Sequence, residues 1–467
     1  MPNRAYTYYD LTASICSVCY EKVEAKIIFE EERVYLVKRC LKHGPEKVLI
    51  STDKDYYLKC RHYIKPSEMP HRFNTPIRYG CPYDCGLCPD HEQHSCLTLI
   101  EVTDRCNLEC PICYANSSPH REQFRSLQVI ESMLDAVVAN EKEPDVVQIS
   151  GGEPTIHPEF FAILDAAKAR PIRHLMINTN GIKIAQDREF VRKLAAYMPG
   201  IEIYLQFDSL EPHVLKELRG ADLSMIREKA LYHLNEFGLS TTLVVTVKRG
   251  LNDDQLGSIL NYAIQQPAVR GVTFQPIQEA GRLDQYDPGE HRLTLSEVRT
   301  KILEQSDLFD SDDLIPVPCH PDALAMAYAL KLGEEVLPLT GLLPPDMLLE
   351  GGRNTIVFEQ DAELRAKMNQ LFSLSQTPES TPSSLRELLC CLPKVEAPAS
   401  LSYENVFRVL IMQFMDARDL DIRSVKRSCV HIAHPDGRII PFDTYNLFYR
   451  DGLEERLTPI RSKIEGE

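Results

Sequence analysis

Short apolar runs alternate with amphipathic helical patterns through the middle of the chain. The run at 97–103, LTLIEVT, is rich in β-branched residues and predicts a buried strand. The segment after it has apolar residues at helical spacing, at Leu127, Ile130, Leu134 and Val137. Further strand-like runs lie at 145–150, 174–179, 202–208, 241–247 and 271–276, with helical stretches between them. This alternation predicts a parallel sheet with right-handed crossovers, and six strands fit a partial (β/α)6 barrel. A site is expected at the carboxyl ends of the strands.

Composition divides the chain into four segments. Residues 1–75 hold short β-rich stretches beside cysteines, which predict a zinc-ribbon or rubredoxin-like domain. Residues 76–97 form a cysteine-rich segment, and 98–310 form the barrel. Residues 311–467 are less regular and predict an α+β extension. This extension contains a linker at 376–387 that is rich in Ser, Thr and Pro.

Charge and cysteine content narrow the class of protein. The formal net charge of −16 argues against nucleic acid as a partner. No apolar run is long enough to span a membrane, and the first residues lack the apolar core of a secretory signal. We therefore expect a cytoplasmic protein, with peripheral membrane contact left open. Eleven of the fifteen cysteines lie within 16–113. Because disulfides are disfavoured in the cytosol, such clustering indicates metal ligands.

The central motif is CNLECPICY at 106–114, directly after the first barrel strand. Its cysteines, Cys106, Cys110 and Cys113, suit three irons of a [4Fe–4S] cluster and leave the fourth iron without a protein ligand. The amino and carboxylate groups of S-adenosylmethionine (SAM) fit that vacancy. An electron from the cluster then cleaves SAM to a 5′-deoxyadenosyl radical. The chemistry requires an electron donor such as flavodoxin or ferredoxin.

The motif resembles that of the radical SAM superfamily, including an aromatic residue, Tyr114, after the last cysteine. GGEP at 151–154 follows the second strand, where the family offers backbone acceptors to the SAM ammonium group and glycines permit close approach. For Asp208 and Thr246, strand-end caps are the alternative role. The resemblance implies SAM contacts from Tyr114, Gly151, Gly152, Glu153, Pro154, Asn178, Asn180, Asp208, Thr246 and Gln275.

A second C-x3-C-x2-C motif lies upstream. It is formed by Cys81, Cys85 and Cys88, and Cys96 supplies a fourth thiolate. Four thiolates bind every iron of a cluster and leave no place for SAM, so we expect an auxiliary [4Fe–4S] cluster. The alternatives are a second SAM-cleaving site and a zinc site.

The first cysteines form a pair of knuckles, CSVC at 16–19 and CLKH at 40–43. Such pairs hold zinc or a single iron on short hairpins. Cys16, Cys19 and Cys40 are three predicted ligands. The fourth is His43 or Cys60, and local spacing favours His43.

The segment at 80–115, with the ribbon before it and the stretch at 425–450, resembles a narrower family. This family comprises the tetraether lipid synthases and overlaps with class D radical SAM methyltransferases, which are linked to methanopterin biosynthesis. The resemblance implies a third [4Fe–4S] cluster, held by Cys319, Cys429 and one or both of the cysteines at 390–391. Ser428 and Asp443 stand where cysteines are expected, so this cluster is left open. The alternative for the cysteines at 390–391 is that they are packed apolar thiols.

The metal complement favours C–C bond formation on lipid alkyl chains, after activation of an unreactive C–H bond. The apolar, proline-broken stretch at 335–352 would then line a tunnel or dock on a membrane, or it is an ordinary core segment. The alternative is a class D methyltransferase acting on a small pterin-like substrate, which requires a polar pocket. An outside alternative is a peptide-modifying maturase. No winged-helix pattern for peptide recognition precedes the barrel.

Overall fold

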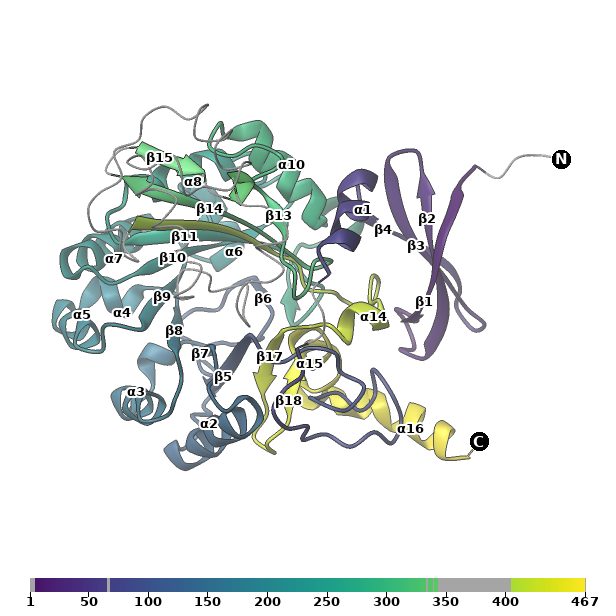
Figure 1. The fold of residues 1–467 in the computed structure, drawn as a ribbon. Helices are drawn as coiled ribbons and strands as arrows, with labels where there is room; N and C mark the ends of the chain where they lie inside the picture. Colours follow the sequence, from purple (N-terminus) through teal and green to yellow (C-terminus); the bar gives the residue numbers. More distant parts are fainter. Residues whose placement is uncertain (1–4, 65–67, 333–334, 339, 343–404, 467) are drawn as a thin grey trace, which may run out of the picture.

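A twelve-stranded sheet and a small four-stranded sheet organise the protein (Figure 1). The structure is a computed structural model that describes residues 5–64, 68–332, 335–338, 340–342 and 405–466. The linker at 376–387, the cysteines at 390–391 and most of the apolar stretch at 335–352 lie outside the described residues. In the described part of the chain, no helix is both long and apolar enough to cross a membrane.

Six parallel strands form the middle of the large sheet, in the order β11-β10-β9-β8-β7-β5. The predicted partial barrel of alternating strands and helices is confirmed. The strands are β5 (Leu97–Thr103), β7 (Val146–Gly151), β8 (His174–Thr179), β9 (Ile201–Gln206), β10 (Thr241–Val247) and β11 (Val269–Pro276). The helices of these units are α2 (Leu127–Glu141), α3 (Phe160–Lys168), α4 (Ile182–Gln186), α5 (Arg188–Ala195), α6 (Pro212–Arg219), α7 (Ser224–Phe237) and α8 (Leu256–Gln265). Three short elements lie in the loops of the barrel: β6 (Ile112–Cys113), η1 (Pro154–Ile156) and β12 (Arg282–Leu283). The helices α9 (Pro288–His291) and α10 (Leu295–Gln305) come after the last barrel strand.

The C-terminal extension adds strands to both edges of this sheet. β16 (Val406–Met412) runs parallel beside β11, and β17 (Val430–Ala433) runs parallel beside β5. A parallel edge strand has unpaired backbone groups, and these additions satisfy them. The remaining strands here are β13 (Ile315–Pro316), β14 (Leu324–Leu332), β15 (Glu335–Pro338) and β18 (Ile439–Pro441). The helices are η2 (Thr340–Leu342), α14 (Ile422–Val425), α15 (Phe442–Phe448), η7 (Arg450–Arg456) and α16 (Leu457–Gly466).

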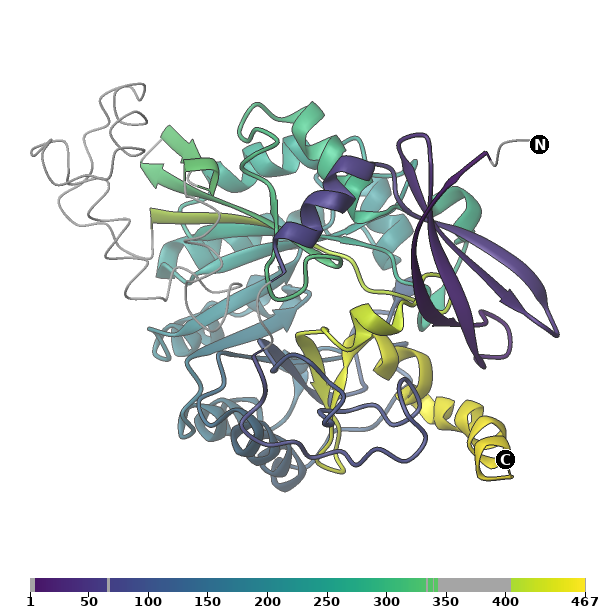
Figure 2. The ribbon, with the colours of Figure 1, turned by 45° about the vertical axis from the view of Figure 1, so that its right-hand side comes forward.

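The N-terminal domain is an antiparallel meander of β1 (Thr7–Ile15), β2 (Lys22–Glu30), β3 (Arg33–Cys40) and β4 (Gly44–Ser51), followed by α1 (Lys54–His62). Figure 2 shows it standing beside the barrel and the C-terminal segment. The buried Lys38 docks it, because its ammonium donates to the carbonyls of Ala417 (2.8 Å) and Arg418 (2.6 Å). These two hydrogen bonds fix the domain against the extension, and a third, to the Ile15 carbonyl at 2.8 Å, holds the ammonium within its own domain.

A buried ion pair fastens β16 across the sheet. The guanidinium of Arg408 on β16 reaches Glu202 on β9 at 2.5 Å, and His174 lies 3.1 Å from the same carboxylate. The side chain crosses β11 at Gly271, where an added Cβ would lie 2.7 Å from the Arg408 Cγ atom. Burial acts to raise the pKa of Glu202, but Arg408, His174 and Thr242 together outweigh it and lower that pKa below its usual value.

Replacing Glu202 by alanine is expected to lower the free energy of unfolding by about 3–5 kcal/mol, because the buried Arg408 would lose its ion pair with Glu202. The depressed pKa means that this contribution is present above the ordinary carboxyl range and is lost as the pH falls through it. Urea unfolding at several pH values measures both effects. Glu189→Ala, at an exposed pair with Arg192, is the matched control and should change stability little. Equal effects of the two variants would contradict the assignment.

Candidate active site and metal centres

The GGEP turn packs directly against the loop that carries the SAM-cluster cysteines. The backbone N–H of Gly152 donates to the Thr103 carbonyl at 2.7 Å, and that of Glu153 donates to Arg105 at 3.0 Å. A Cβ added at Gly151 would lie 2.3 Å from the Thr103 oxygen, and one at Gly152 would lie 2.1 Å from the Arg105 oxygen. Only glycine permits this approach of two backbones.

The side chain of Glu153, which follows β7, links the end of β7 to the end of β8 by hydrogen bonds. Its buried carboxylate accepts from the Thr179 hydroxyl (2.8 Å), the Asn180 backbone N–H (2.8 Å) and Thr155. Burial raises the pKa of Glu153. The Asn180 amide in turn donates to Asn107 at 2.7 Å, beside Cys106. Glu153 therefore positions the cysteine loop through Asn180.

The cysteine loop is held on its other side by β12. Arg282 donates to the carbonyls of Cys110 (2.6 Å) and Ser117 (2.7 Å), and β12 pairs with β6 at Cys113. A pocket opens over this loop, and Cys106, Cys110 and Cys113 all line it. Burial raises the pKa of the Cys106 thiol to about 12, so a thiolate at this position requires a bound cation such as iron.

A chain of polar side chains crosses the carboxyl ends of β7, β8, β9 and β10 under this pocket, with Arg219 of α6 as one of its links. Ser150 on β7 accepts from Asn178 on β8 (3.2 Å), and Asn178 accepts from Gln206 on β9 (2.8 Å). Arg219 bridges Gln206 (3.1 Å) to Thr246 on β10 (3.0 Å). The chain makes a continuous polar layer, which we call the polar floor.

Arg219 is the principal site residue that the sequence analysis missed. It lines the pocket, whereas Asp208 is fully buried beside it and holds its guanidinium at 2.7 Å. Burial acts to lower the pKa of Arg219, but the Asp208 carboxylate raises it above its usual value. Asp208 also binds Arg227 at 3.0 Å. The structure therefore makes Asp208 a support for Arg219, which gives the pocket a fixed positive charge.

The other predicted SAM contacts are placed as follows. The residues that line the pocket are Tyr114, Gly151, Gly152, Glu153, Asn178, Asn180, Thr246 and Gln275. Pro154 and Asp208 are not among the described residues that line the pocket. Pro154 begins the short helix η1 behind the turn. Gln206 also lines the pocket and was not named in the sequence analysis. Its position could have identified it, because it is the last residue of β9, as Thr179 is of β8 and Gly151 is of β7.

The far wall of the pocket comes from the extension. The rings of Phe414 and Phe442 lie 4.0 Å apart between centroids, and Phe442 lies 5.1 Å from Tyr114. Gln278, after β11, also lines the pocket and donates to the Met415 carbonyl at 2.6 Å. The extension is thus part of the site.

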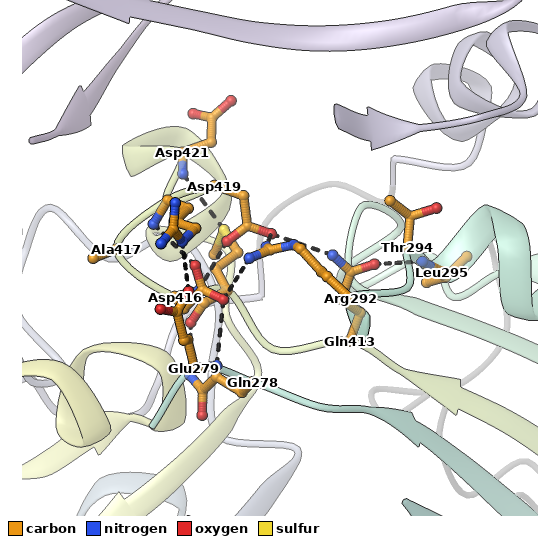
Figure 3. A network of polar contacts seen from close by, with 12 residues as sticks. Gln278, Glu279, Arg292, Thr294, Leu295, Gln413, Asp416, Ala417, Asp419 and Asp421 are labelled. Atoms are coloured by element: carbon orange, nitrogen blue, oxygen red, sulfur yellow. Dashed lines mark hydrogen bonds and ion pairs between the residues drawn. The ribbon is translucent and has the colours of Figure 1, made fainter. Parts of the chain in front are cut away.

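A buried ionic network holds that wall in place (Figure 3). Arg292 reaches Asp416 at 2.6 Å and Asp419 at 2.5 Å, and the backbone N–H of Glu279 donates to Asp416 at 3.3 Å. Gln413 joins Asp419 to the Leu295 N–H at the start of α10. The network therefore locks the loop after β11 against the segment that follows β16.

The N-terminal knuckles bring four ligand atoms together. The ring nitrogen of His43 lies 3.5 Å from the sulfurs of Cys16 and Cys40, and Cys19 lies 3.8 Å from Cys40. These four residues fit a zinc ribbon, with zinc or a single iron bound. Cys60 lies elsewhere: it is buried in α1 beside Tyr56. His43, and not Cys60, is therefore the fourth member of this group.

The four cysteines of the upstream motif, which the sequence analysis assigned to one cluster, lie in two separate places in the structure. Cys81, Cys85 and Cys88 lie in the loop over α15, where the Tyr449 hydroxyl accepts from the Cys85 N–H at 3.1 Å. Cys96 instead groups with Cys319 and Cys429. The physical reason is strand pairing, because β17 lies beside β5 and places Cys429 next to Cys96. Both groups fit auxiliary metal centres.

Asp443, which stands where the family resemblance leads us to expect a cluster cysteine, makes hydrogen bonds within the extension. Its carboxylate accepts from the Met415 N–H at 2.6 Å and from the Ser428 hydroxyl at 3.4 Å. Burial raises its pKa to about 7. Asp443 belongs to neither group of ligand atoms that converge in the described residues.

Comparison with known proteins gives the same picture. The radical SAM superfamily matches residues 100–263, and the HMPTM N-terminal zinc ribbon domain matches residues 8–52. The 7,8-dihydro-6-hydroxymethylpterin dimethyltransferase of Methanocaldococcus jannaschii is 31% identical, over 96% of this chain and 95% of its own. The GTP 3',8-cyclase of Alkaliphilus metalliredigens is 27% identical, over 50% of this chain and 68% of its own.

Among solved structures, Streptococcus suis SuiB bound to S-adenosylmethionine is 21% identical, with a TM-score of 0.36, over 44% of this chain and 46% of that chain. The near full-length match to the dimethyltransferase decides the family. The cysteine loop, the GGEP turn and the ribbon agree with it. The chain belongs to the radical SAM superfamily, in the family that includes the M. jannaschii dimethyltransferase.

Proposed function

We propose that this radical SAM enzyme adds a one-carbon unit to a small pterin-like ring. The observation that carries the proposal is a set of side-chain amides and hydroxyls that converge in a pocket otherwise lined mostly by apolar side chains. Besides the polar floor, the amides of Gln148, Gln275 and Gln278 and the hydroxyl of Tyr204 line it. A pterin has a polar edge of donors and acceptors that matches such groups, whereas an alkyl chain would leave them facing hydrocarbon.

The aromatic wall suits the flat faces of a bicyclic ring. Phe414, Phe442 and Tyr114 lie opposite the strand ends, and offset stacking on such rings favours a planar substrate. The name of the M. jannaschii relative points to the same substrate class. Together these features favour the pterin alternative over the lipid reaction expected from the metal complement. Of the apolar stretch invoked for a lipid tunnel, only residues 335–338 and 340–342 are described.

SAM supplies the radical when it is bound to the cluster of Cys106, Cys110 and Cys113. The residues of this chain then have distinct tasks. Arg219 offers its guanidinium to the SAM carboxylate, and the backbone of the GGEP turn accepts from the ammonium group. Tyr114, with Arg450 5.3 Å from its ring, closes the side of the pocket next to β5. Glu101 pairs with Arg450 at 2.7 Å and keeps this cation fixed.

The assignment to radical SAM chemistry is tested by the cleavage of SAM to 5′-deoxyadenosine. Anaerobically reconstituted protein with SAM and dithionite is expected to release 5′-deoxyadenosine. Cys110→Ala is expected to release none, because the cluster loses an iron ligand. Cys60→Ala removes a buried thiol that lies outside every ligand group and should retain the activity. Liquid chromatography with mass spectrometry measures the product, and wild-type protein without product would refute the assignment.

The substrate class is tested by competition. The assay contains SAM, dithionite, a reduced hydroxymethylpterin, an archaeal-type diether lipid and a separate one-carbon donor, either further SAM or a methylene-carrying reduced pterin cofactor. The enzyme is expected to give a pterin product heavier by a one-carbon unit. Deuterium placed on the lipid chain ends should then stay out of 5′-deoxyadenosine. Deuterium transfer from the lipid, with the pterin unchanged, would restore the lipid reaction. Modification of a peptide alone would favour a maturase.

The role of Arg219 is tested by comparing two arginines that share Asp208. Arg219→Gln is expected to raise the KM for SAM by about 10- to 100-fold, because a charge-assisted pair is lost. Arg227→Gln removes the other partner of Asp208 at 3.0 Å but is not among the described pocket-lining residues. It should cost stability and leave the KM for SAM near the wild-type value. Similar KM values in both variants would count against a contact between Arg219 and SAM.

A further inference from the structure

Three buried thiols from distant parts of the chain meet beside the first barrel strand. The sulfurs of Cys96, Cys319 and Cys429 all lie within 4.8 Å of one another, and Cys319 and Cys429 are 3.5 Å apart. All three side chains are fully or almost fully buried. As thiols the three would be held by weak S–H···S hydrogen bonds, whereas as thiolates they would require a cation in this desolvated place. Three sulfurs that converge on one point fit a metal site.

Backbone pairing brings these thiols together. β17 runs parallel beside β5 with Val430 opposite Leu97, and the Leu97 N–H donates to the Cys429 carbonyl at 3.1 Å. Cys96 and Cys429 therefore stand immediately before the first residues of two adjacent strands. Cys319 comes from the turn after β13, and Gln93 donates to its carbonyl at 3.3 Å. The site therefore joins β5 to two segments of the extension, one of them at β17, which lies beside β5 in Figure 1.

His94 is the nitrogen donor next to this group. Its Nε2 atom lies 3.6 Å from the Cys96 sulfur, and its Nδ1 atom lies 3.0 Å from a carboxylate oxygen of Glu141. The other Glu141 oxygen accepts from the Ser95 N–H at 3.0 Å, which fixes the segment. A carboxylate on one ring nitrogen that directs the other to a metal is a common arrangement around histidine ligands.

The geometry points to a mononuclear zinc site formed by Cys96, Cys319 and Cys429, with His94 as its fourth ligand. Zinc–sulfur bonds of about 2.3 Å in a tetrahedron separate the sulfurs by about 3.8 Å. The ribbon shows this spacing, with Cys19 and Cys40 at 3.8 Å. The His94 ring lies beside Cys96 and outside the group of sulfurs that converge within 4.8 Å, so zinc binding would move the ring toward that group.

A cubane cluster requires a wider arrangement, because each thiolate binds a different iron. Within the described part of the chain, two groups of ligand atoms converge within 4.8 Å: the ribbon and this site. Cys106, Cys110 and Cys113, which are described, do not form such a group. The Cys96 site therefore has the spacing of the ribbon and not that of the SAM-cluster motif, contrary to the third cluster implied by family resemblance.

The site is tested by metal and sulfide content of the anaerobically purified and reconstituted full chain. Wild-type protein is expected to contain about eight acid-labile sulfides, four for each of two cubanes. Cys319→Ser and Cys429→Ser are each expected to lose one zinc while iron and sulfide stay unchanged. Cys60→Ser is the matched control, as a buried thiol outside both groups, and should lose no metal.

The outcomes separate the alternatives. About twelve sulfides in the wild type would show a third cubane and overturn the proposal, and this measurement does not depend on whether a variant folds. Unchanged zinc in folded Cys429→Ser would also overturn it. His94→Ala is expected to lose the zinc, whereas Glu68→Gln, whose carboxylate lies 3.4 Å from the His94 ring, should keep it. The reverse result would move the fourth position to Glu68 and overturn the assignment of His94.

Discussion

The contact between the GGEP turn and the cysteine loop is the constraint on which the site depends. Two backbone hydrogen bonds join the ends of β5 and β7, and glycines at 151 and 152 leave no room for a side chain between them. A loop with three cysteines has many conformations available, and selecting one costs conformational entropy. Hydrogen bonds to a rigid strand end offset part of that cost. The thiols are therefore held near the conformation that a cluster needs before any metal binds.

The parallel sheet explains why polar side chains can gather beneath that loop. Alternate residues of each strand point into the barrel, and carboxyl ends of parallel strands share one edge. Ser150, Asn178, Gln206, Thr246 and Gln275 occupy the last inward positions of five successive strands. Deeper inward positions combine apolar side chains, such as Met176 and Val244, with the buried ion pair of Glu202 and Arg408. The barrel is thus polar where SAM and substrate would bind and closed by packed side chains below.

Much of this could be predicted from the sequence, because the signals are local. β-Branched runs marked all six barrel strands, and close cysteine spacing marked both the ribbon and the SAM-cluster loop. Asp208 was placed in the pocket because it follows a strand. In the structure β9 ends at Gln206, and Asp208 has a positive φ of 66° that takes its carboxylate away to Arg219. Only the backbone conformation distinguishes the two positions.

The grouping of Cys96 could not be predicted, because it depends on which strand pairs with β5. Spacing along the chain assigns Cys96 to its neighbours at 81–88, but β17 arrives from the far end of the sequence. The same long-range pairing gives the pocket its aromatic wall, which local pattern also could not place. Long-range strand order is decided by the packing of the whole sheet rather than by any one segment.

The two edges of the sheet pose one physical problem with two different solutions. An open parallel sheet must cover its outer strands, and here the same extension covers both. At the β11 edge, the buried pair of Arg408 and Glu202 reaches across the sheet, through the space that Gly271 leaves. At the β5 edge, Cys96 and Cys429 lie side by side at the starts of β5 and β17. A metal there would fasten the strand that leads into the SAM-cluster loop, as the ion pair fastens the strand that leads to Met412 and Phe414 in the pocket wall. Because each fastening lies at the amino end of its strand, both leave the carboxyl ends free for chemistry.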